Sequence, residues 1–402
     1  MDVVKILVNS LEILLIGYFG FASIYVFIFS FAGLFSARKR KEILHKQRKF
    51  AVLIPGYKED NVIIDVAKQA LQQTYPADLF EVVIIADSFQ QETLYNLEKL
   101  PLRVVEVSFE KSTKSKALNQ AMKVIGDDYD VALILDADNI MEEGFVEKIN
   151  KSFNQGYKVV QGHRIAKNTN TSFAILDAIS EEINNHIFRK GHRVVGLSSA
   201  LIGSGMAFDY YFFKSTMANV NAVGGFDKEL ELKLLKNRTK IEYLNDALVL
   251  DEKVQKSEVF ANQRKRWLSA QFVYFGRYFV PGLRELITKG NVDFFDKVYQ
   301  MVSPPRVLLL GLVSLITFTY FILNLIWPSN LMAIPEIFWY ASFGLVILAF
   351  AFAVPKKFYS KATFNALLTL PKAFMVMFLS LFKLKGANKK FIHTQHGTIN
   401  SQ

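Results

Sequence analysis

Three long apolar runs constrain this chain most, because a bilayer-spanning helix needs about 20 consecutive apolar residues. The segment from Ile13 to Phe35 contains no charged residue. Val307 to Trp327 is a second such run, and Ile337 to Val354 is a shorter third one. A cleaved signal peptide is disfavoured for the first run, which is too long and is followed, not preceded, by basic residues. The sequence therefore predicts three membrane spans.

A fourth apolar stretch, Ala362 to Phe382, differs from these three. Pro371 and Lys372 interrupt it, and each remaining piece is too short to cross a bilayer. We expect interfacial or re-entrant helices here, with a kinked span as the alternative.

The distribution of basic residues predicts the orientation of the spans. Positively charged flanks remain on the cytoplasmic side, so the N-terminus is expected outside and residues 37–304 inside. The second span then leads out and the third returns, which leaves the C-terminus cytoplasmic. We expect an integral protein of the bacterial inner (cytoplasmic) membrane. The basic residues directly after the first run are Arg38, Lys39, Arg40, Lys41, Lys46, Arg48 and Lys49.

The formal net charge of +11 does not by itself indicate nucleic-acid binding. Because the basic residues cluster beside the apolar runs, contact with the anionic head groups of a lipid bilayer is the simpler explanation, and no nucleic-acid partner is expected. The absence of cysteine excludes disulfides and thiolate metal sites.

Between the first two runs the sequence alternates between strand-like and helix-like segments. Short apolar strands are expected at 50–54, 82–86, 102–107 and 131–135, with helices at 62–72 and 116–124. This rhythm predicts an α/β fold with a parallel, doubly wound sheet. Polar side chains follow the strands and should meet in one crevice, although each is also compatible with ordinary turn chemistry. These residues are Tyr57, Glu59, Asp87, Asp136 and Asp138.

The Asp136-Ala137-Asp138 sequence is the sharpest of these signals. It directly follows the apolar run from Val131 to Leu135, which is typical of a buried strand. Two carboxylates at a strand end favour a site for Mg²⁺ or Mn²⁺ that holds a diphosphate. A solvated turn is the alternative for this pair alone.

Several further motifs occur in a characteristic order. Together with Asp87 and Asp136-Ala137-Asp138, the chain resembles a membrane-bound family 2 glycosyltransferase, of the class that includes cellulose, chitin and hyaluronan synthases. The resemblance covers residues 50–270, and the last motif is similar to the Gln-x-x-Arg-Trp signature of that family. The other matching segments are Pro55-Gly56-Tyr57-Lys58-Glu59, Lys114-Ser115-Lys116-Ala117-Leu118-Asn119, Gly203-Ser204-Gly205, Gly224-Gly225-Phe226-Asp227 and Gln263-Arg264-Lys265-Arg266-Trp267.

The resemblance implies a GT-A fold, a nucleotide-sugar-binding domain with a mostly parallel central sheet, here joined to transmembrane and interfacial helices. It implies that Tyr57, Glu59 and Asp87 surround the uracil and ribose of a UDP-sugar. Lys114 would lie near the nucleotide diphosphate.

The same resemblance assigns the remaining groups. Asp138 would be the principal ligand of Mn²⁺ or Mg²⁺, with Asp136 beside the ribose and the metal. Gln263 and Arg266 would contact the nucleotide-sugar, and Trp267 would border the acceptor. Gly203, Ser204 and Gly205 would also line the acceptor side.

The catalytic base is less clearly marked. The family places an Asp at the end of a Thr-Glu-Asp motif just before Leu-Glu-Leu, and aligning on Leu230-Glu231-Leu232 puts Glu229 at the position of the base. Asp227 is the competing assignment. A third interpretation is that these charges form the solvated face of a helix from Lys228 to Leu235.

Near the C-terminus, Thr394 and His396 lie in a segment that resembles a family lid over the bound nucleotide. A disordered tail is the alternative. His393 and His396 could instead be a metal pair, but two histidines on a tail lack the other ligands.

The sequence thus predicts an inverting, metal-dependent glycosyltransferase that moves a sugar from a UDP-sugar to a saccharide or lipid-linked acceptor at the cytoplasmic membrane face. The alternative is an inactive nucleotide-sugar-binding regulator, and a transporter is disfavoured because the predicted spans carry no charge. Three spans are fewer than long-chain polysaccharide synthases usually use for a channel. A dimer or other homo-oligomer could form such a channel, or the acceptor could be a lipid or a short oligosaccharide. The expected organisation is a transmembrane helix at 1–36, the GT-A domain at 37–270, interfacial helices at 271–304 and a C-terminal membrane region at 305–402.

Overall fold

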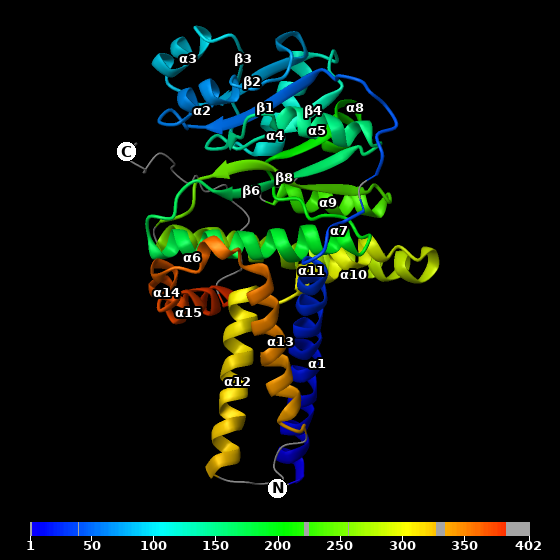
Figure 1. Cartoon of the computed structure of the whole chain (residues 1–402), viewed down its shortest axis with the longest axis vertical. Coiled ribbons are helices and arrows are strands. Elements are labelled where there is room, and N and C mark those ends of the chain that lie inside the picture. The colour runs from blue at the N-terminus through cyan, green and yellow to red at the C-terminus, as the bar shows by residue number, and fades with distance from the viewer. Residues whose placement is uncertain (1, 39, 221–224, 256, 327–333, 383–402) are drawn as a thin grey trace.

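The computed structural model describes residues 2–38, 40–220, 225–255, 257–326 and 334–382. An α/β lobe occupies one end of the molecule, a layer of helices lies beneath it, and three long helices extend away from this layer (Figure 1). The described N-terminal end lies at the far tip of the extended helices, remote from the sheet.

Among the described residues, eight strands form one sheet in the order β3-β2-β1-β4-β7-β6-β8-β5. The first four strands along the chain pair in parallel, as the alternating sequence pattern predicted. The strands are β1 (Phe50–Tyr57), β2 (Phe80–Asp87), β3 (Arg103–Val107), β4 (Val131–Ile134), β5 (Ile140–Met141), β6 (Val159–Ala166), β7 (Met206–Asp209) and β8 (Ile241–Asp251).

The complete sheet is mixed, which differs from the doubly wound parallel sheet expected from the sequence. Strand β7 runs antiparallel to both β4 and β6, and β5 runs antiparallel to β8. The α/β alternation that predicts parallel pairing is confined to the segment before Asp136. Beyond it, β7 is a strand of four residues that follows the Gly203-Ser204-Gly205 turn. No alternation of strand-like and helix-like segments in the sequence predicts this strand or its direction.

Helices cover both faces of this sheet. The two predicted helices of the first half are present, as α2 and α4. Two hydrophobic cores result, one on each face of the sheet, because successive residues of a buried strand point to opposite faces. Leu53 packs in the core that contains α4, and Val52 packs in the core that contains α2. The helices of this lobe are α2 (Ile63–Ala70), η1 (Ala77–Leu79), α3 (Gln91–Glu98), α4 (Lys114–Ile125), α5 (Phe145–Asn154), α8 (Tyr210–Met217) and α9 (Phe226–Lys236).

The layer beneath the lobe joins the sheet to the extended helices. Helix α10, which carries Gln263, has 33 residues and continues without a break across position 270. The boundary expected there between the catalytic domain and interfacial helices therefore falls inside one helix. The layer comprises α6 (Ser172–Asn184), the π-helix η2 (Asn185–Gly191), α7 (His192–Val194), α10 (Ser257–Lys289) and α11 (Val292–Val302).

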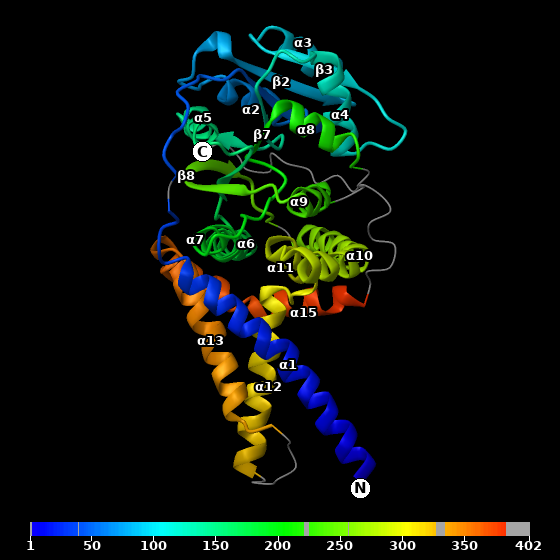
Figure 2. The same ribbon diagram turned by 90° about the vertical axis from the view of Figure 1, so that its right-hand side faces the viewer.

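Three apolar helices extend from this layer, and they are α1 (Asp2–Ala32), α12 (Arg306–Ile326) and α13 (Ile337–Ala353). Their positions agree with the three predicted apolar runs, and they pack against one another (Figure 2). Two of them, α1 and α12, are long and apolar enough to cross a membrane. The third, α13, has 17 residues and a length of about 25 Å, slightly short of the roughly 30 Å hydrocarbon core.

The fourth apolar stretch forms two short helices, α14 (Lys361–Leu367) and α15 (Leu370–Leu381), which follow the short turn η3 (Lys356–Phe358). They bend by 42° at residues 368–369 and lie crosswise to α12 and α13 (Figure 1). The interruption precedes Pro371, which lies in the first turn of α15, where proline removes no helical hydrogen bond. Such a bent pair is compatible with either a broken span or a re-entrant segment.

Candidate active site

A large cavity opens at the carboxyl ends of β1, β2, β4 and β8, where an open α/β sheet places its ligands. Its volume is about 1460 Å³. It continues past α6 and α10 to the apolar helices α1, α12 and α13. Most of the residues singled out in the sequence line its end nearest the sheet.

The ends of β1 and β2 bring three of these residues together. Tyr57 and Asp87 are paired in the parallel register of the two strands, and Glu59 follows in the next turn. All three line the cavity, and Glu59 and Asp87 are buried. The Ser88 hydroxyl donates to Oδ1 of Asp87 over 3.0 Å, which fixes the orientation of that carboxylate. Two buried carboxylates beside an aromatic ring are suited to accept hydrogen bonds from a base and a ribose.

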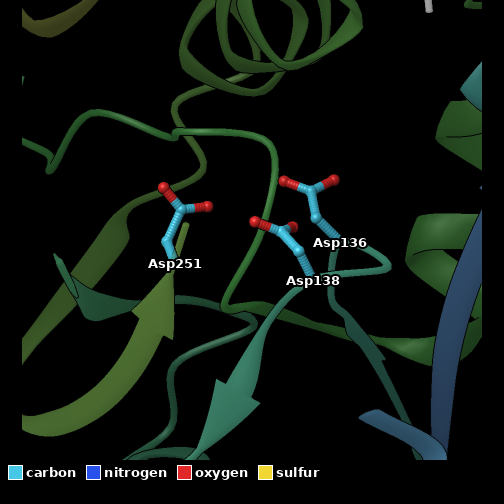
Figure 3. Close-up of side chains that lie close together, drawn as sticks. All are labelled: Asp136, Asp138 and Asp251. Carbon is cyan, nitrogen blue, oxygen red and sulfur yellow. The ribbon is translucent and has the colours of Figure 1, made fainter. Parts of the chain in front are cut away.

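Three carboxylates form the acidic cluster at the centre of this end of the cavity (Figure 3). Asp136 and Asp138 follow β4, and Asp251 is the last residue of β8. One carboxylate oxygen from each lies within 4.8 Å of the others. Asp138 and Asp251 are buried, whereas Asp136 is partly exposed to the cavity. The third member, Asp251, was not identified in the sequence.

Basic side chains surround this cluster. The Nη1 atom of Arg164 lies 3.4 Å from Oδ1 of Asp251 and 3.8 Å from Oδ2 of Asp136, and Lys253 Nζ lies 2.7 Å from Oδ2 of Asp251. Burial alone would lower the pKa of Arg164, but Asp251 and Glu181 outweigh it, so this pKa is raised. The pKa of Lys253 is raised for the same reason. Both side chains therefore carry a fixed positive charge beside the cluster.

The acidic cluster fits a hard divalent cation. Its three carboxylates supply oxygen ligands, the type that Mg²⁺ and Mn²⁺ prefer. Asn139 Nδ2 donates to Oδ1 of Asp251 over 3.1 Å, and the backbone N–H of Glu252 donates to Oδ2 of Asp138 over 3.0 Å. These bonds orient the carboxylates in the way that outer-sphere partners orient metal ligands.

Lys114 connects the cluster with the opposite wall of the cavity. Thr113 caps α4 by accepting from the Lys116 N–H, so Lys114 is the first residue of that helix. The Nζ atom of Lys114 forms an ion pair with Asp136 and donates to the carbonyl oxygen of Gly203 over 2.8 Å. Gly203 has a φ of +86°, a conformation that favours glycine. A lysine here can neutralise charge on a diphosphate.

The two candidates for the catalytic base lie in different surroundings. Asp227 lines the cavity and stands opposite Gly203, whose added Cβ would lie 3.9 Å from the Asp227 carboxyl carbon. Glu229 is not among the lining residues and forms an ion pair with Lys233 over 2.9 Å and one with Arg277 over 3.7 Å. Of the two, Asp227 is the one that lines the cavity. An alignment on a short Leu-Glu-Leu segment did not reveal which residues of the first turn of α9 face the cavity.

Helix α10 carries the final motif into the same cavity. Gln263, Arg266 and Trp267 all line the cavity. Residues three or four positions apart lie on the same side of a helix, so Gln263 shares one side of α10 with Arg266 and Trp267. Burial lowers the pKa of Arg266 from its ordinary value. The buried Oε1 atom of Gln263 has no hydrogen-bond partner among the described residues, which leaves it available to a ligand. Trp267 is 41% exposed and packs against the Arg264 guanidinium, 4.6 Å from the ring centre.

Other predicted residues do not reach the cavity wall or are not described. Ser204 and Gly205 lie behind Gly203, where the Ser204 hydroxyl accepts from Arg164 over 3.4 Å. They support the loop, and only Gly203 of the three lines the cavity. Thr394 and His396, the predicted lid, lie outside the described residues.

Asp251, Arg164 and Lys253 were not among the residues predicted from the sequence. For Asp251 a signal was present, because Ala247-Leu248-Val249-Leu250 precedes it as an apolar run, in the pattern that had identified Asp87 and Asp136. Arg164 and Lys253 have no such local pattern. The place of Arg164 beside the cluster depends on the pairing of β6 with β8, which links positions far apart in the chain, and Lys253 follows from Asp251, which lies two residues before it.

The comparison with protein-family models finds one described as "Glycosyltransferase like family 2", which matches residues 47–270, more than half of the chain. A comparison with curated proteins gave no significant match.

The chain is also similar to several solved structures. The mannosyltransferase PcManGT from Pyrobaculum calidifontis, in complex with GDP-Man and Mn²⁺, has a TM-score of 0.50 and 14% identity over 85% of this chain and 97% of its own. TarS 1–349 from S. aureus has a TM-score of 0.42 and 14% identity, covering 83% of this chain and 92% of that one. Glucosyl-3-phosphoglycerate synthase from Mycobacterium tuberculosis, with Mn²⁺ and UDP, has a TM-score of 0.35 and 15% identity over 52% and 72%. The similarity to PcManGT supports a GT-A-like fold.

Proposed function

This chain belongs to the glycosyltransferase like family 2, and on that premise we propose that it is an inverting transferase that moves a sugar from a nucleoside-diphosphate sugar to an acceptor hydroxyl. One observation carries the proposal. The acidic cluster, the strand-end residues Tyr57, Glu59 and Asp87, and the carboxylate of Asp227 all face one cavity. A donor with a base, a diphosphate and a sugar needs these three kinds of group in one place.

The chain's own residues account for binding and orienting the donor. The Tyr57 ring offers a face for the base, and the carboxylates of Glu59 and Asp87 accept hydrogen bonds from the base N–H or the ribose hydroxyls. Asp136, Asp138 and Asp251 would hold a divalent cation. That ion, when bound, neutralises the charge that develops on the leaving diphosphate. Lys114 adds a second positive charge at the same place.

Asp227 is the proposed base. In the transfer, the acceptor oxygen forms a bond to the anomeric carbon while the bond from that carbon to the diphosphate oxygen breaks. The acceptor proton passes to Asp227, and the bonding electron pair leaves with the diphosphate. Asp227 lies in the first turn of α9, at the end of that helix that faces the cavity. Attack from the face opposite the diphosphate inverts the anomeric centre.

The donor nucleotide is proposed to be UDP. The carboxylates of Glu59 and Asp87 would accept from the N–H of uracil, but they would accept equally from guanine. The sequence resemblance to UDP-sugar-using synthases therefore carries this choice, and parallel assays with UDP- and GDP-sugars test it.

We further propose that the protein spans the membrane with α1, α12 and α13 and that the lobe containing the sheet faces the cytoplasm. The three helices pack against one another and extend away from the lobe, which supports this arrangement (Figure 2). Basic residues 38–49 follow α1 at the end nearest the lobe, which is the side where positive charge is retained.

The deciding experiment measures nucleotide release from the purified full-length protein with a panel of UDP- and GDP-sugars. Release is expected with at least one donor, lost in EDTA and restored by Mn²⁺ or Mg²⁺. Donor binding without any release, across the panel and with acceptor extracts present, would instead favour the inactive nucleotide-sugar-binding regulator.

A further inference from the structure

The large cavity has a second, apolar part that a nucleotide-sugar does not need. Its walls come from the extended helices and from the pair α14 and α15. Apolar walls of this extent are stabilised by an apolar ligand, because water in contact with them has no hydrogen-bonding partners. The lining residues include Val26, Leu310, Phe350, Val354, Leu367 and Met377.

Arg306 stands where this apolar part begins. It is the first residue of α12 and lines the cavity. Its guanidinium donates to the Ser180 hydroxyl over 3.0 Å and to the side-chain oxygen of Asn184, both neutral groups. Within the described part of the chain it forms no ion pair, and its Nε atom has no hydrogen-bond partner. A positive charge placed away from bulk water favours an anionic partner.

One face of α6 links Arg306 to the sugar end of the cavity. Asp177, Ser180 and Asn184 are spaced by 3 and 4 residues, so they lie on the same side of the helix. Asp177 forms an ion pair with Arg264, whose guanidinium packs against Trp267. The carboxylate of Asp177 is thus paired with Arg264, whereas the hydrogen bonds of Arg306 within the described residues go to neutral side chains, so the positive charge of Arg306 is available to an anionic ligand.

We propose that the acceptor is a lipid whose head group contains a phosphate and a hydroxyl. The phosphate binds Arg306, the hydrocarbon chain occupies the apolar part of the cavity, and the hydroxyl extends towards Asp227. This inference rests on the proposed function, in which that hydroxyl oxygen bonds to the anomeric carbon and releases its proton to Asp227 while the nucleoside diphosphate departs. The apolar walls come from helices that would lie in the bilayer, so such a lipid has a route from the membrane to the site.

Binding is tested first, without any turnover. The full-length protein in nanodiscs is titrated with radiolabelled hexadecyl phosphate, with inorganic phosphate and hexadecanol as competitors. Arg306→Gln is expected to weaken binding by about tenfold or more, the usual effect of losing a charge-assisted contact. Arg306→Lys should retain part of the affinity, and Arg284→Gln, an exposed arginine on α10, should change nothing.

Two results would overturn the phosphate assignment. One is wild-type affinity in Arg306→Gln, with thermal unfolding showing that the variant is folded. The other is displacement of the probe by inorganic phosphate at equal concentration, which would mean a free anion site with no use for the hydrocarbon chain.

The hydrocarbon part is tested with a matched pair of substitutions on one helix. Leu310 lines the cavity, whereas Leu315, on the same helix, is 57% exposed and lies outside it. Leu310→Trp fills the apolar part and should abolish probe binding, and Leu315→Trp should leave it unchanged. Equal binding by both variants would contradict the proposed route of the lipid chain.

Activity then separates this inference from the proposed function. The enzyme is incubated with labelled nucleotide-sugars and either a membrane lipid extract or water-soluble oligosaccharides. Label is expected in the organic phase, with Arg306→Gln reducing it and sparing slow nucleotide release to water. Label only in soluble products would overturn the lipid acceptor while leaving the transferase intact. If no donor gives nucleotide release, the proposed transferase function is wrong. The binding of hexadecyl phosphate and its loss in Arg306→Gln would still decide whether the cavity holds a lipid phosphate.

Discussion

The Nζ atom of Lys253 lies 2.7 Å from Oδ2 of Asp251, although only Glu252 separates the two residues in the chain. The same lysine lies 2.9 Å from Oε2 of Glu181 on α6. Lys253 therefore joins the acidic cluster at the end of β8 to the helix layer beneath the sheet. A cluster fixed in this way is oriented before a metal or a donor binds, which reduces the ordering that binding would otherwise require.

The first prediction concerns the third carboxylate. Asp251→Asn should raise the Mn²⁺ concentration needed for half-maximal nucleotide release by at least about tenfold, since loss of even an outer-sphere partner has an effect of that order. Asp138→Asn, which removes the more deeply buried carboxylate, should abolish transfer. Mn²⁺ binding to the purified protein, followed by electron paramagnetic resonance, provides a measurement independent of turnover.

The matched control for this prediction is Asp246→Asn, an exposed carboxylate on the same strand β8. It should leave Mn²⁺ binding unchanged. If Asp251→Asn also binds Mn²⁺ with wild-type affinity, Asp251 serves to position Arg164 and Lys253 and is not a ligand.

The second prediction separates the two candidate bases. Asp227→Asn should preserve donor binding while kcat falls by roughly 10²–10⁴-fold, the usual contribution of a positioned general base. Glu229→Gln should retain most of kcat but lower the thermal unfolding midpoint, because it removes the partner of Lys233 and Arg277. Steady-state kinetics with calorimetric donor binding checks both. The reverse pattern, an inactive Glu229→Gln and an active Asp227→Asn, would restore the alignment-based assignment.

Much of the first half of the sheet could be predicted because its strands are short apolar runs separated by amphipathic helices. Asp87 and Asp136 could be assigned to the site on the same basis, since parallel strands end at one edge. The direction of β7 and the position of Asp251 depend on pairings between distant segments, which a local pattern does not contain. The orientation of α9 could not be predicted either. Its sequence has charged residues at positions 227, 228, 229 and 231, and this pattern does not indicate which of them faces the cavity.

The third prediction concerns pH and Lys297, which is buried against α9. Burial lowers its pKa from the ordinary 10.5 to about 8, although Glu231 lies 2.6 Å away and opposes the shift. Lys228, also on α9, adds to the lowering, and Asp296 on its own helix counters it. Between pH 8 and 10.5 the unfolded chain binds more protons at this group than the folded one does, so its contribution to stability increases with pH.

The comparison protein for this effect is the double variant Lys297→Met, Glu231→Leu, which removes both charges together. Thermal midpoints of the two proteins are measured in detergent from pH 7 to 10. The wild type should gain stability relative to the double variant as the pH rises above about 8. A difference that stays constant, or that changes in the opposite direction, would mean that Lys297 has an ordinary pKa in the folded protein.

The last prediction concerns topology, because it decides on which side of the membrane the transfer takes place. Helices α14 and α15 have 7 and 12 residues, about 10 Å and 18 Å in length, and neither alone reaches across the roughly 30 Å hydrocarbon core. If the bent pair crossed, the basic residues of the C-terminal tail would be placed outside, against the charge bias that orients the other spans.

The chain has no cysteine, so single cysteines can be introduced at Ser329, Tyr359 and Ser401 and treated with an impermeant thiol reagent in intact cells. Position 329 should react, and positions 359 and 401 should be protected until the membrane is permeabilised. Reaction at 401 with protection at 359 would mean that α14 and α15 form one broken span, and the C-terminal segment with Thr394 and His396 could then not close over a cytoplasmic active site.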